Sequence, residues 1–457
     1  MPLLPAAIWF ALGLVLLVIA LLPNGIVRLR WPAALLVLAA FVASLALAWG
    51  ASPQPFAHWQ SALIFDDLAH LLLPPVWTGV TAALLVTLFL TGARYELAIG
   101  ALSAAVATAG ILSANPLLTV FLLQAGAVLV LAGLVVYSHR TEANPLLSVA
   151  TALKFITLNV VGAACLVMAL LLSTFYALNQ DRLELPRIIA AVFVVGFGLA
   201  AGAMPFYFHY PDVFDAAPSL VTTSLIGPLQ CLAFVYLVRT AGNGPWLLAD
   251  NHVVGVLVFG ALGGSVLAAL LTFGQRTVNR VLAFNAIRET GWIVFGIASA
   301  TVLGWTGALT FLAARTVSGP LLLAAVAFFQ NHSVKLEGTA RLLPIATFGW
   351  CVGVLATVGI PPAANFWGLR DLFRSSLVFG SSAPALLLLS ALLALWRFGR
   401  LTATVFSGSP DAGTEREPAA PSWVLGSLGF GILFAGVVPR LFQVPVDHLL
   451  GAFAFLR

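Results

Sequence analysis

Ionisable side chains inside long apolar segments are the residues of this sequence that could do chemistry. Arg288 and Glu289 lie within the segment from Leu282 to Gly296, and Arg315 lies in the middle of the next one. If these segments span a membrane, a charge at their centre costs about 2.5–3.5 kcal/mol on insertion scales, so each one needs a reason to be there. Adjacent residues point about 100° apart on a helix, so we expect Arg288 and Glu289 to face partners of their own.

Three further charges interrupt apolar segments. Arg370 and Asp371 follow the pair Pro361-Pro362 by about two helical turns. Lys154 lies near the start of another segment. Its position also allows a simpler interpretation, in which the ammonium group reaches interfacial water while the stem of the side chain stays buried.

The deeper charges suggest a polar axis through the second half of the chain, made of Arg288, Glu289, Arg315 and Arg370. A chain of protonatable groups and water could carry protons along such an axis. Arginine stays charged and is a poor proton relay, so it would act electrostatically on Glu289 and on water.

Prolines break two of the apolar segments, one between Gly198 and Thr222 and one at Gly359-Ile360-Pro361-Pro362. Proline lacks a backbone donor and clashes with the preceding turn, so we expect the helix to be interrupted at both places. Broken helices are tolerated at membrane depth where they line a polar cavity or are buried, and a plain loop between two helices is the alternative. The cavity candidates are Pro205, Tyr207, His209, Asp212, Pro361 and Pro362.

The composition predicts an all-α polytopic membrane protein. Of the 457 residues, 61% are hydrophobic and only 8% are charged, whereas a soluble domain has about 25% charged residues. Apolar segments of about 20 residues are long enough to span a bilayer as helices, and the dyad alternation of transmembrane strands is absent. We count about fourteen spans, at residues 5–23, 32–49, 69–91, 95–113, 116–137, 147–176, 187–214 (broken), 219–240, 252–274, 280–301, 304–330, 342–374 (broken), 382–405 and 421–440.

The two broken spans, the seventh and the twelfth, are five spans apart. An odd repeat length inverts the second copy, which is the pattern of inverted-repeat transporters. The spacing therefore predicts two inverted five-helix repeats. The predicted units are the first three helices in 1–94, repeats in 95–240 and 252–406, and a polar loop, the last span and a short tail in 407–457.

Basic residues predict the orientation, because loops on the cytoplasmic side carry more of them. Loops after odd-numbered spans hold Arg28, Arg30, Arg94, Arg140, Arg276, Arg280, Lys335, Arg341, Arg397, Arg400 and Arg416. The other side holds Arg182, Arg187, Arg239, Arg370, Arg374, Arg440 and Arg457. This bias favours both termini outside, in a bacterial inner (cytoplasmic) membrane.

The remaining patterns argue against other classes of site. The net charge of +5 comes from basic residues mainly at segment ends, so it does not indicate nucleic-acid binding. The three cysteines show no disulfide or metal-ligand spacing, and the seven histidines form no HxxxH motif. No Gly-rich nucleotide fingerprint is present. We expect no cofactor, no metal site and no active site of the chain's own.

Four segments resemble motifs of the antiporter-like membrane subunits of respiratory complex I, Mrp-type cation/proton antiporters and membrane-bound hydrogenases. MPFYFHYPDVFDAAPSLVTT resembles VPFHxWxPDVYEGAPxPVTA, and GQRTVNRVLAFNAIRETGW resembles QxDxKRLLAYSSIxHMGY. VGIPPAANFWGLRDLF resembles AGIPPxxGFxGKFxxF, and ATALKFITLNVVG resembles EAAMKYFLLGAL. The resemblance runs from about Ile111 to Phe406 and implies a proton-conducting module.

The resemblance also implies a charged central axis, with a glutamate on helix five and lysines on helices six to eight and twelve. This chain has Gln124 at the glutamate position and Lys154 at the helix-six lysine. Ala200 and Gln230 fall on the lysines of helices seven and eight, and Leu369 falls on that of helix twelve. The first-half relay is therefore mostly lost, and a lone buried Lys154 would tend toward its neutral form.

Three more positions depart from the family pattern. Tyr207 replaces the histidine of the PFH motif, and Glu289 takes the place of the histidine in SSIxHMG. Arg315 lies where related subunits carry histidine or lysine on helix eleven. The second half thus keeps ionisable groups, in altered positions.

These observations predict a membrane subunit of a multisubunit complex that translocates protons, or alternatively Na⁺, through its second half. Its expected surroundings are the lipid bilayer and other membrane subunits, with a soluble enzyme or a peripheral redox arm as a further partner. The complex would be like an NADH-quinone oxidoreductase, a hydrogenase or an antiporter. Two alternatives stay open: a scaffold subunit that does not pump, and the membrane partner of a soluble enzyme in ion-driven inorganic carbon uptake.

Overall fold

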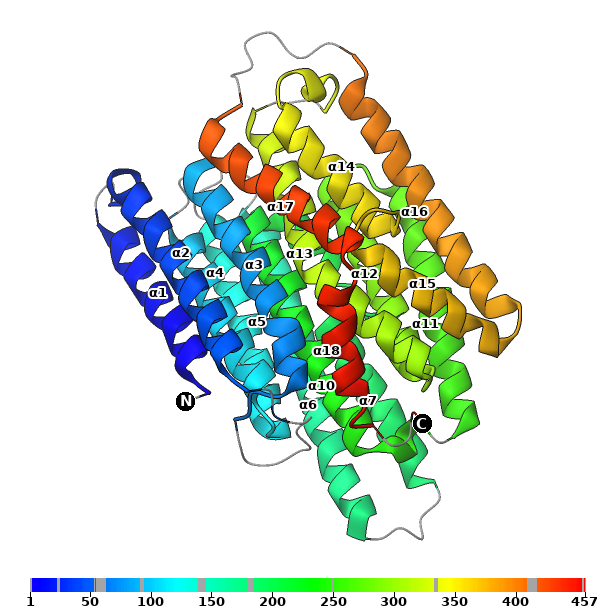
Figure 1. The fold of residues 1–457 in the computed structure, drawn as a ribbon. Coiled ribbons are helices and arrows are strands. Elements are labelled where there is room, and N and C mark those ends of the chain that lie inside the picture. Colours follow the sequence, from blue (N-terminus) through cyan, green and yellow to red (C-terminus); the bar gives the residue numbers. More distant parts are fainter. Residues whose placement is uncertain are drawn as a thin grey trace.

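The computed structural model describes residues 2–22, 25–52, 54, 63–90, 94–138, 145–178, 184–248, 250–332, 336–408, 417–453 and 456. Within these residues the secondary structure consists of helices joined by turns and loops, with two isolated bridges (Figure 1). Twelve of the described helices are long and apolar enough to cross a membrane, and two shorter apolar helices, Leu185–Ala201 and Pro344–Val358, belong to the broken spans. The predicted all-α polytopic fold with about fourteen spans is confirmed.

The helices follow the predicted spans closely. Their bounds are α1 Leu4–Leu21, α2 Gly25–Gly50, α3 Asp67–Leu90, α4 Tyr95–Leu112, α5 Pro116–Ser138, α6 Pro145–Leu178, α7 Leu185–Ala201, α8 Tyr210–Ala216, α9 Ser219–Ser224, α10 Gln230–Asn243, α11 Asn251–Leu271, α12 Val278–Ala298, α13 Val302–His332, α14 Pro344–Val358, α15 Asn365–Ser376, α16 Ser382–Phe406, α17 Ala419–Val437 and α18 Arg440–Leu450. A π-helical turn, Leu225–Leu229, joins α9 to α10, and four 3₁₀ turns are Pro245–Leu248, Thr272–Gly274, Thr339–Arg341 and Leu377–Phe379.

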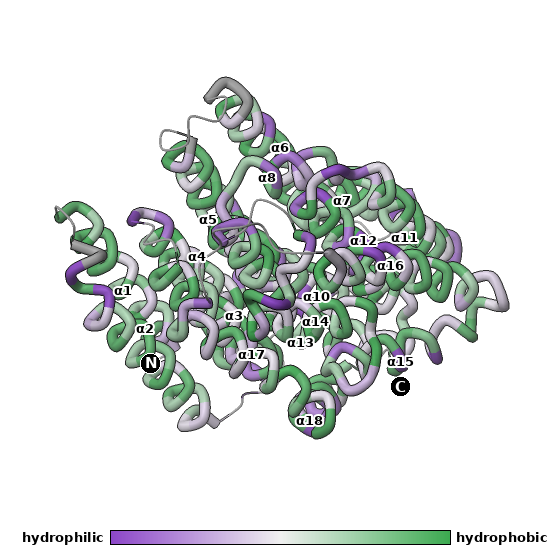
Figure 2. The backbone as a smooth tube through the Cα atoms, turned by 90° about the horizontal axis from the view of Figure 1, so that it is seen from above, coloured by the Kyte–Doolittle hydropathy of each residue, from purple (hydrophilic) through white to green (hydrophobic). Residues whose placement is uncertain are grey.

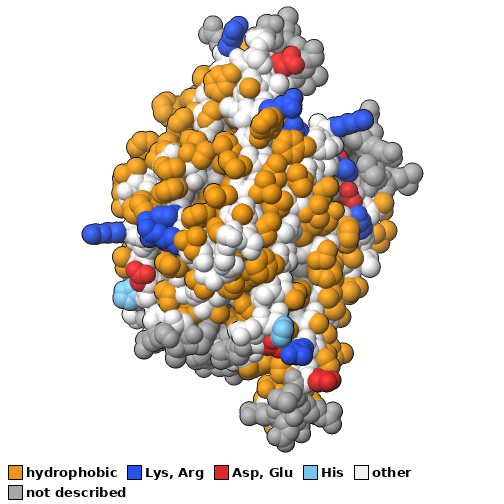
Figure 3. All heavy atoms as spheres, turned by 90° about the vertical axis from the view of Figure 1, so that its right-hand side faces the viewer, with side chains coloured by type: hydrophobic (Ala, Val, Ile, Leu, Met, Phe, Trp, Pro, Cys, Tyr) orange, Lys and Arg blue, Asp and Glu red, His pale blue; other side chains and the backbone are white. Residues whose placement is uncertain are grey.

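Helix α13 forms the middle of the bundle. It packs against α3, α12, α14, α15, α17 and α18, and seen from above it lies near α10 and α14, with α1 and α11 toward opposite ends (Figure 2). The outer surface is mainly hydrophobic on the face drawn in Figure 3. Large apolar side chains such as Trp49, Leu178 and Trp396 are exposed on the outside of the bundle. Such an apolar surface is suited to contact with lipid. The chain is an integral membrane protein.

Glycine ends the first helix at each of the two breaks. Gly202 follows α7 with φ 65°, and Gly359 follows α14 with φ 79°. In this left-handed region only glycine avoids a Cβ penalty, and a Cβ at Gly202 would also collide with the ring of Tyr210. Prolines follow, at Pro205 and Pro361, and each break contains one cis X–Pro bond. Both predicted interruptions are confirmed.

Two local features differ from the sequence prediction. The eighth span was expected to be a regular helix, but Pro228 lies inside it and the chain forms a π turn there. A π turn keeps the helix continuous while it accommodates the missing proline donor. The tail after the fourteenth span contains a further amphipathic helix, α18, which packs against α3 and α13.

The orientation argument loses one of its residues. Arg239, counted as a loop arginine, is fully buried within α10. Several others lie outside the described residues, namely Arg140, Arg182, Lys335, Arg416 and Arg457. The sidedness of the termini and the division into repeats at 95–240 and 252–406 remain predictions.

Candidate functional site

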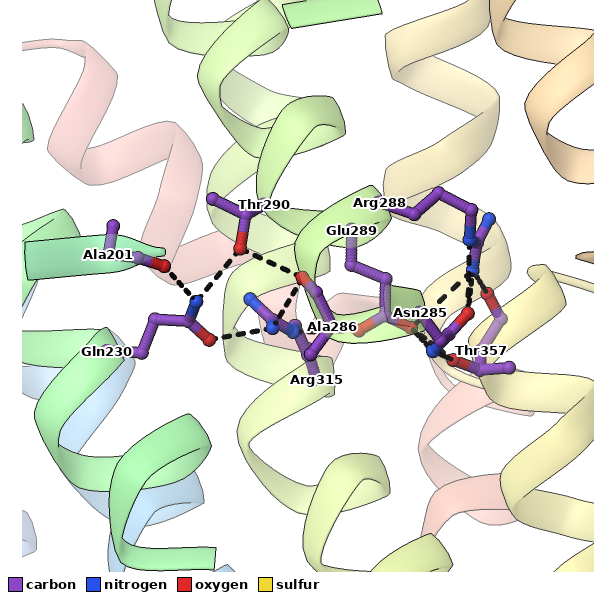
Figure 4. A network of polar contacts seen from close by, with 9 residues as sticks. All are labelled: Ala201, Gln230, Asn285, Ala286, Arg288, Glu289, Thr290, Arg315 and Thr357. Carbon is purple, nitrogen blue, oxygen red and sulfur yellow. Dashed lines mark hydrogen bonds and ion pairs between the residues drawn. The ribbon is translucent and has the colours of Figure 1, made fainter. Parts of the chain in front are cut away.

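A network of polar side chains is buried where four helices meet inside the bundle (Figure 4). Helix α12 contributes most of the members, and α10, α13 and α14 contribute the others. The central network consists of Gln230, Asn285, Arg288, Glu289, Thr290, Arg315 and Thr357. The spans that hold α10, α12 and α13 have some of the highest proportions of buried residues among the described spans. These polar groups therefore face protein rather than lipid.

The carboxylate of Glu289 is satisfied on both oxygens. Its Oε2 lies 2.8 Å from Arg315 Nε. Its Oε1 accepts from Asn285 Nδ2 at 3.1 Å and from the hydroxyl of Thr357. Asn285 can reach Glu289 because residues four apart share one face of a helix. Both carboxylate oxygens therefore have partners inside the bundle, as buried polar groups normally do.

Gln230 extends the network across the bundle to the broken end of α7. Arg315 Nη2 donates to Gln230 Oε1 at 2.7 Å and to Ala286 O at 3.0 Å. Gln230 Nε2 in turn donates to Ala201 O at 2.5 Å and to Thr290 Oγ1 at 2.9 Å. The sequence analysis treats Gln230 as a lost relay position. The structure shows instead that its amide oxygen holds Arg315, where a lysine would repel it.

Arg288 extends the network to the other break. Its Nη2 donates to Asn285 Oδ1 at 2.8 Å and to Thr357 O at 2.7 Å, in the last turn of α14. Its guanidinium also lies 4.0 Å from the ring centroid of Trp292. Its distance to Glu289 is long, 3.7 Å. The expectation that the two neighbours face partners of their own holds only in part, because both contact Asn285 and Thr357, while Arg315 contacts Glu289. The last carbonyls of a helix lack intrahelical donors, and Arg288 and Gln230 supply donors at α14 and α7.

Net charge sets what this site can do chemically. Two guanidinium groups face one carboxylate, so the ionised network carries one excess positive charge. Arg288 Nη1 and Arg315 Nη1 have no hydrogen-bond partner among the described residues, and buried donors of this kind are commonly bridged by water. Glu289 is the member whose charge changes with one proton, because arginine stays protonated.

Lys154 is not the lone buried lysine that the sequence analysis expects. Its Nζ lies 2.7 Å from Asp212 Oδ2, and 42% of its side chain is exposed. Asp212 Oδ1 also lies 3.2 Å from Arg280 Nη2, and Arg280 Nε lies 3.0 Å from Asp215 Oδ2. The prediction failed because Asp212 is 58 residues away in sequence and reaches Lys154 only through the break. We call these four side chains the α6–α8 charge cluster.

Arg370 lies apart from the central network. It pairs with Asp371 at 2.8 Å and lies 4.5 Å from the Trp367 ring centroid, with 30% of its side chain exposed. Neither charge makes a hydrogen bond or an ion pair with the central network within the described residues. Leu369 is half-buried against the break, where a Cβ at Gly359 would meet it. A role of Arg370 and Asp371 in a proton path stays a prediction.

The other predicted positions are spread around the first break. Gln124 Nε2 donates to Asn159 O at 3.0 Å, and Ala200 is buried. Tyr207 contacts the ring of Phe284, and His209 is fully buried. No group of three or more metal-ligating side chains lies among the described residues.

One buried ion pair was not predicted from the sequence. Arg239 Nη1 lies 2.8 Å from Asp66 Oδ2, and both side chains are fully buried. Arg239 Nη2 also donates to Ile111 O at 3.0 Å, and Asp66 Oδ1 accepts from Ala69 N at 3.0 Å at the start of α3. The signal was the position of Arg239 inside the predicted span 219–240.

We expect Gln230→Lys to destabilise the protein. Two like charges about 4 Å apart repel by about 4 kcal/mol at the effective dielectric near a protein surface, and Arg315 would lose an acceptor. Thermal unfolding of the purified subunit in detergent should therefore shift to lower temperature, whereas Gln230→Glu should not show this repulsion. Adding Arg315→Gln to Gln230→Lys should recover most of the loss, and a Gln230→Lys protein as stable as wild type would contradict this account of Gln230.

Comparison with known proteins supports the same architecture. The family described as "NADH:quinone oxidoreductase/Mrp antiporter, TM" matches residues 114–395. NADH-quinone oxidoreductase subunit N of Moorella thermoacetica is 31% identical over 244 residues, which are 51% of this chain and 50% of that protein. The same subunit of Desulforamulus reducens is 27% identical over 237 residues, half of each chain. The chain thus spans about half the length of the curated relatives it matches.

Solved structures share the whole fold at low identity. A chain of respiratory complex I from Thermus thermophilus with bound NADH superimposes with a TM-score of 0.84 at 18% identity, covering 100% of both chains. A chain of the Mrp complex from Dietzia sp. DQ12-45-1b gives a TM-score of 0.83 at 15% identity, covering 100% of this chain and 99% of that one. The matched region is more than half of the sequence, and the chain belongs to the NADH:quinone oxidoreductase/Mrp antiporter transmembrane family.

Proposed function

We propose that this chain is a membrane subunit of a multisubunit ion-translocating complex and that it carries protons through its second half by way of Glu289. The observation that carries the proposal is the buried contact between Arg315 and Glu289, 2.8 Å apart. Desolvating charges is expensive, and ionisable residues inside membrane segments mark ion pathways more often than not. Family membership and the match to chains of complex I and of an Mrp complex support the same class.

The partners follow from the same comparisons. The similar structures are chains of respiratory complex I and of an Mrp complex, so we propose that this subunit also packs against other membrane subunits. Any driving reaction would belong to those partners or to a peripheral redox arm. We further propose that both termini lie outside, from the distribution of lysine and arginine, and that the membrane is a bacterial cytoplasmic one, as the organisms of the similar proteins suggest.

The geometry suggests how one proton would move. Protonation of Glu289 removes the negative charge that Arg315 faces, while Arg315 keeps the oxygens of Gln230 and Ala286 as acceptors. Release of the proton restores the carboxylate that Arg315 faces. Water at the unpaired guanidinium nitrogens would connect Glu289 to the exterior.

The test is ion flux through the purified assembly in proteoliposomes under an imposed membrane potential. A pH-sensitive dye inside the vesicles reports protons, and ²²Na⁺ uptake is followed in parallel, with protein-free vesicles as the control. Proton uptake above that control is the expected result. Uptake of ²²Na⁺ without proton uptake would show that the transported ion is Na⁺. The absence of both fluxes would favour the function of a scaffold subunit that does not pump.

A further inference from the structure

We propose that His209 is a proton relay that connects the exposed α6–α8 charge cluster to the broken end of α7, where the central network begins. This inference deepens the proposed function and rests on it. It assigns proton uptake to the first break, although three relay positions of the first half carry Gln124, Ala200 and Gln230, which have no ionisable group.

His209 is buried inside the first break, with no exposed surface. Among the described residues neither ring nitrogen makes a hydrogen bond of normal geometry, and the Leu199 carbonyl is an acceptor close to the ring. Buried polar groups normally have partners, so an unpaired imidazole inside a break is unusual. Its ring is held between Phe155 and Tyr210, with centroids at 5.6 Å and 5.0 Å.

One side of His209 leads to the surface. It precedes α8 as its N-cap residue, and Asp212 lies in the first turn of that helix. Phe155, which contacts the ring, directly follows Lys154 in α6. His209 interacts electrostatically with both Lys154 and Asp212, and those two groups are 2.7 Å apart and partly exposed. The charged groups around the ring are therefore Lys154 from α6, Asp212 from α8 and, through Asp212, Arg280 from α12.

The other side of His209 faces the end of α7. Successive carbonyls in its last turn approach three different side chains. Leu199 O lies near His209, Ala200 O lies 3.5 Å from the Tyr210 hydroxyl, and Ala201 O accepts from Gln230. The carboxyl end of a helix is partially negative, so its carbonyls can hold water or accept a hydrogen bond from the ring. Gln230 then leads directly to Arg315 and Glu289.

The proposed step balances as a simple proton transfer. The unprotonated ring nitrogen of His209 takes the excess proton from a hydronium ion at the charge cluster, which leaves neutral water and an imidazolium ring. The other nitrogen then gives its proton to water at the end of α7, which passes it toward Glu289. The ring is then neutral in the other tautomer, and rotation of the ring restores the starting arrangement. The pair of Lys154 and Asp212 controls access, because an unpaired Lys154 would repel the imidazolium.

Proton flux in the same proteoliposomes tests this role with His209→Phe, which keeps a ring, and His209→Gln, which keeps polarity. We expect flux to fall about 100-fold in both, the lower end of what a positioned acid–base group contributes. His332→Phe is the matched control, because His332 bonds Phe328 O at the end of α13, away from the break, and it should keep wild-type flux.

The outcomes separate the two proposals. Wild-type flux in an assembled His209→Phe or His209→Gln complex would overturn the relay while leaving the proposed function standing. An inactive wild type would remove both. Thermal unfolding of each complex shows whether it is assembled. If the His209→Phe complex does not assemble, the proton flux of the assembled His209→Gln complex decides whether His209 is a relay.

Discussion

Replacing Glu289 with glutamine should abolish proton flux while the complex remains assembled. Glutamine has nearly the same shape and can still accept from Thr357, but it cannot take up or release a proton near neutral pH. We expect the flux to fall at least about 100-fold, as for other essential acid–base groups. The measurement is dye-reported proton uptake in proteoliposomes at several pH values.

Two further variants make the Glu289 result interpretable. Glu289→Asp keeps a carboxylate that is one methylene shorter, and it should retain measurable flux. Glu96→Gln removes another buried carboxyl group, on α4 and outside the central network, and should leave flux near the wild-type value. Full flux in Glu289→Gln would exclude Glu289 from the path, whatever else conducts.

The buried pair of Asp66 and Arg239 should give the largest effect on stability. Arg239→Met leaves the carboxylate of Asp66 buried without its cation, and breaking a buried pair in this way typically costs about 3–5 kcal/mol. The pair joins the start of α3 to α10, so the loss of the pair should weaken the packing between these two helices, which are distant in sequence. Thermal unfolding in detergent and the yield of folded protein should both fall.

A double variant and a surface variant complete that test. Asp66→Asn with Arg239→Met removes both charges and should recover much of the stability, because no uncompensated charge remains. Arg187→Met breaks a pair with Asp250 in which 63% of the arginine side chain is exposed, and it should change stability little. If Arg239→Met unfolds at the wild-type temperature, this buried pair does not stabilise the fold.

Local patterns in the sequence were enough to predict the spans and the two breaks. Apolar length decides whether a helix can cross the bilayer, and proline removes a backbone donor from a helix, so neither property depends on distant residues. Gly202 and Gly359 show the same locality, since each ends its helix two or three residues before a proline. Proline alone does not decide a break, because Pro74 and Pro75 lie within α3, Pro320 lies within α13, and Pro228 lies in the π turn between α9 and α10.

The choice of partners for the charges depended on tertiary structure. Arg288, Glu289 and Arg315 were predicted from the cost of burying charge, and the structure brings them together. Arg370 met the same criterion but lies elsewhere.

The sequence by itself thus determined which segments enter the membrane, where two of them break and which charges need an explanation. Only the tertiary structure decided that Gln230 holds Arg315, that Lys154 pairs with Asp212 and that Arg239 pairs with Asp66. These partners lie 58 or more residues apart in sequence. Hydrophobicity makes each segment span the membrane without specifying its neighbours, and only helix packing sets which polar faces meet.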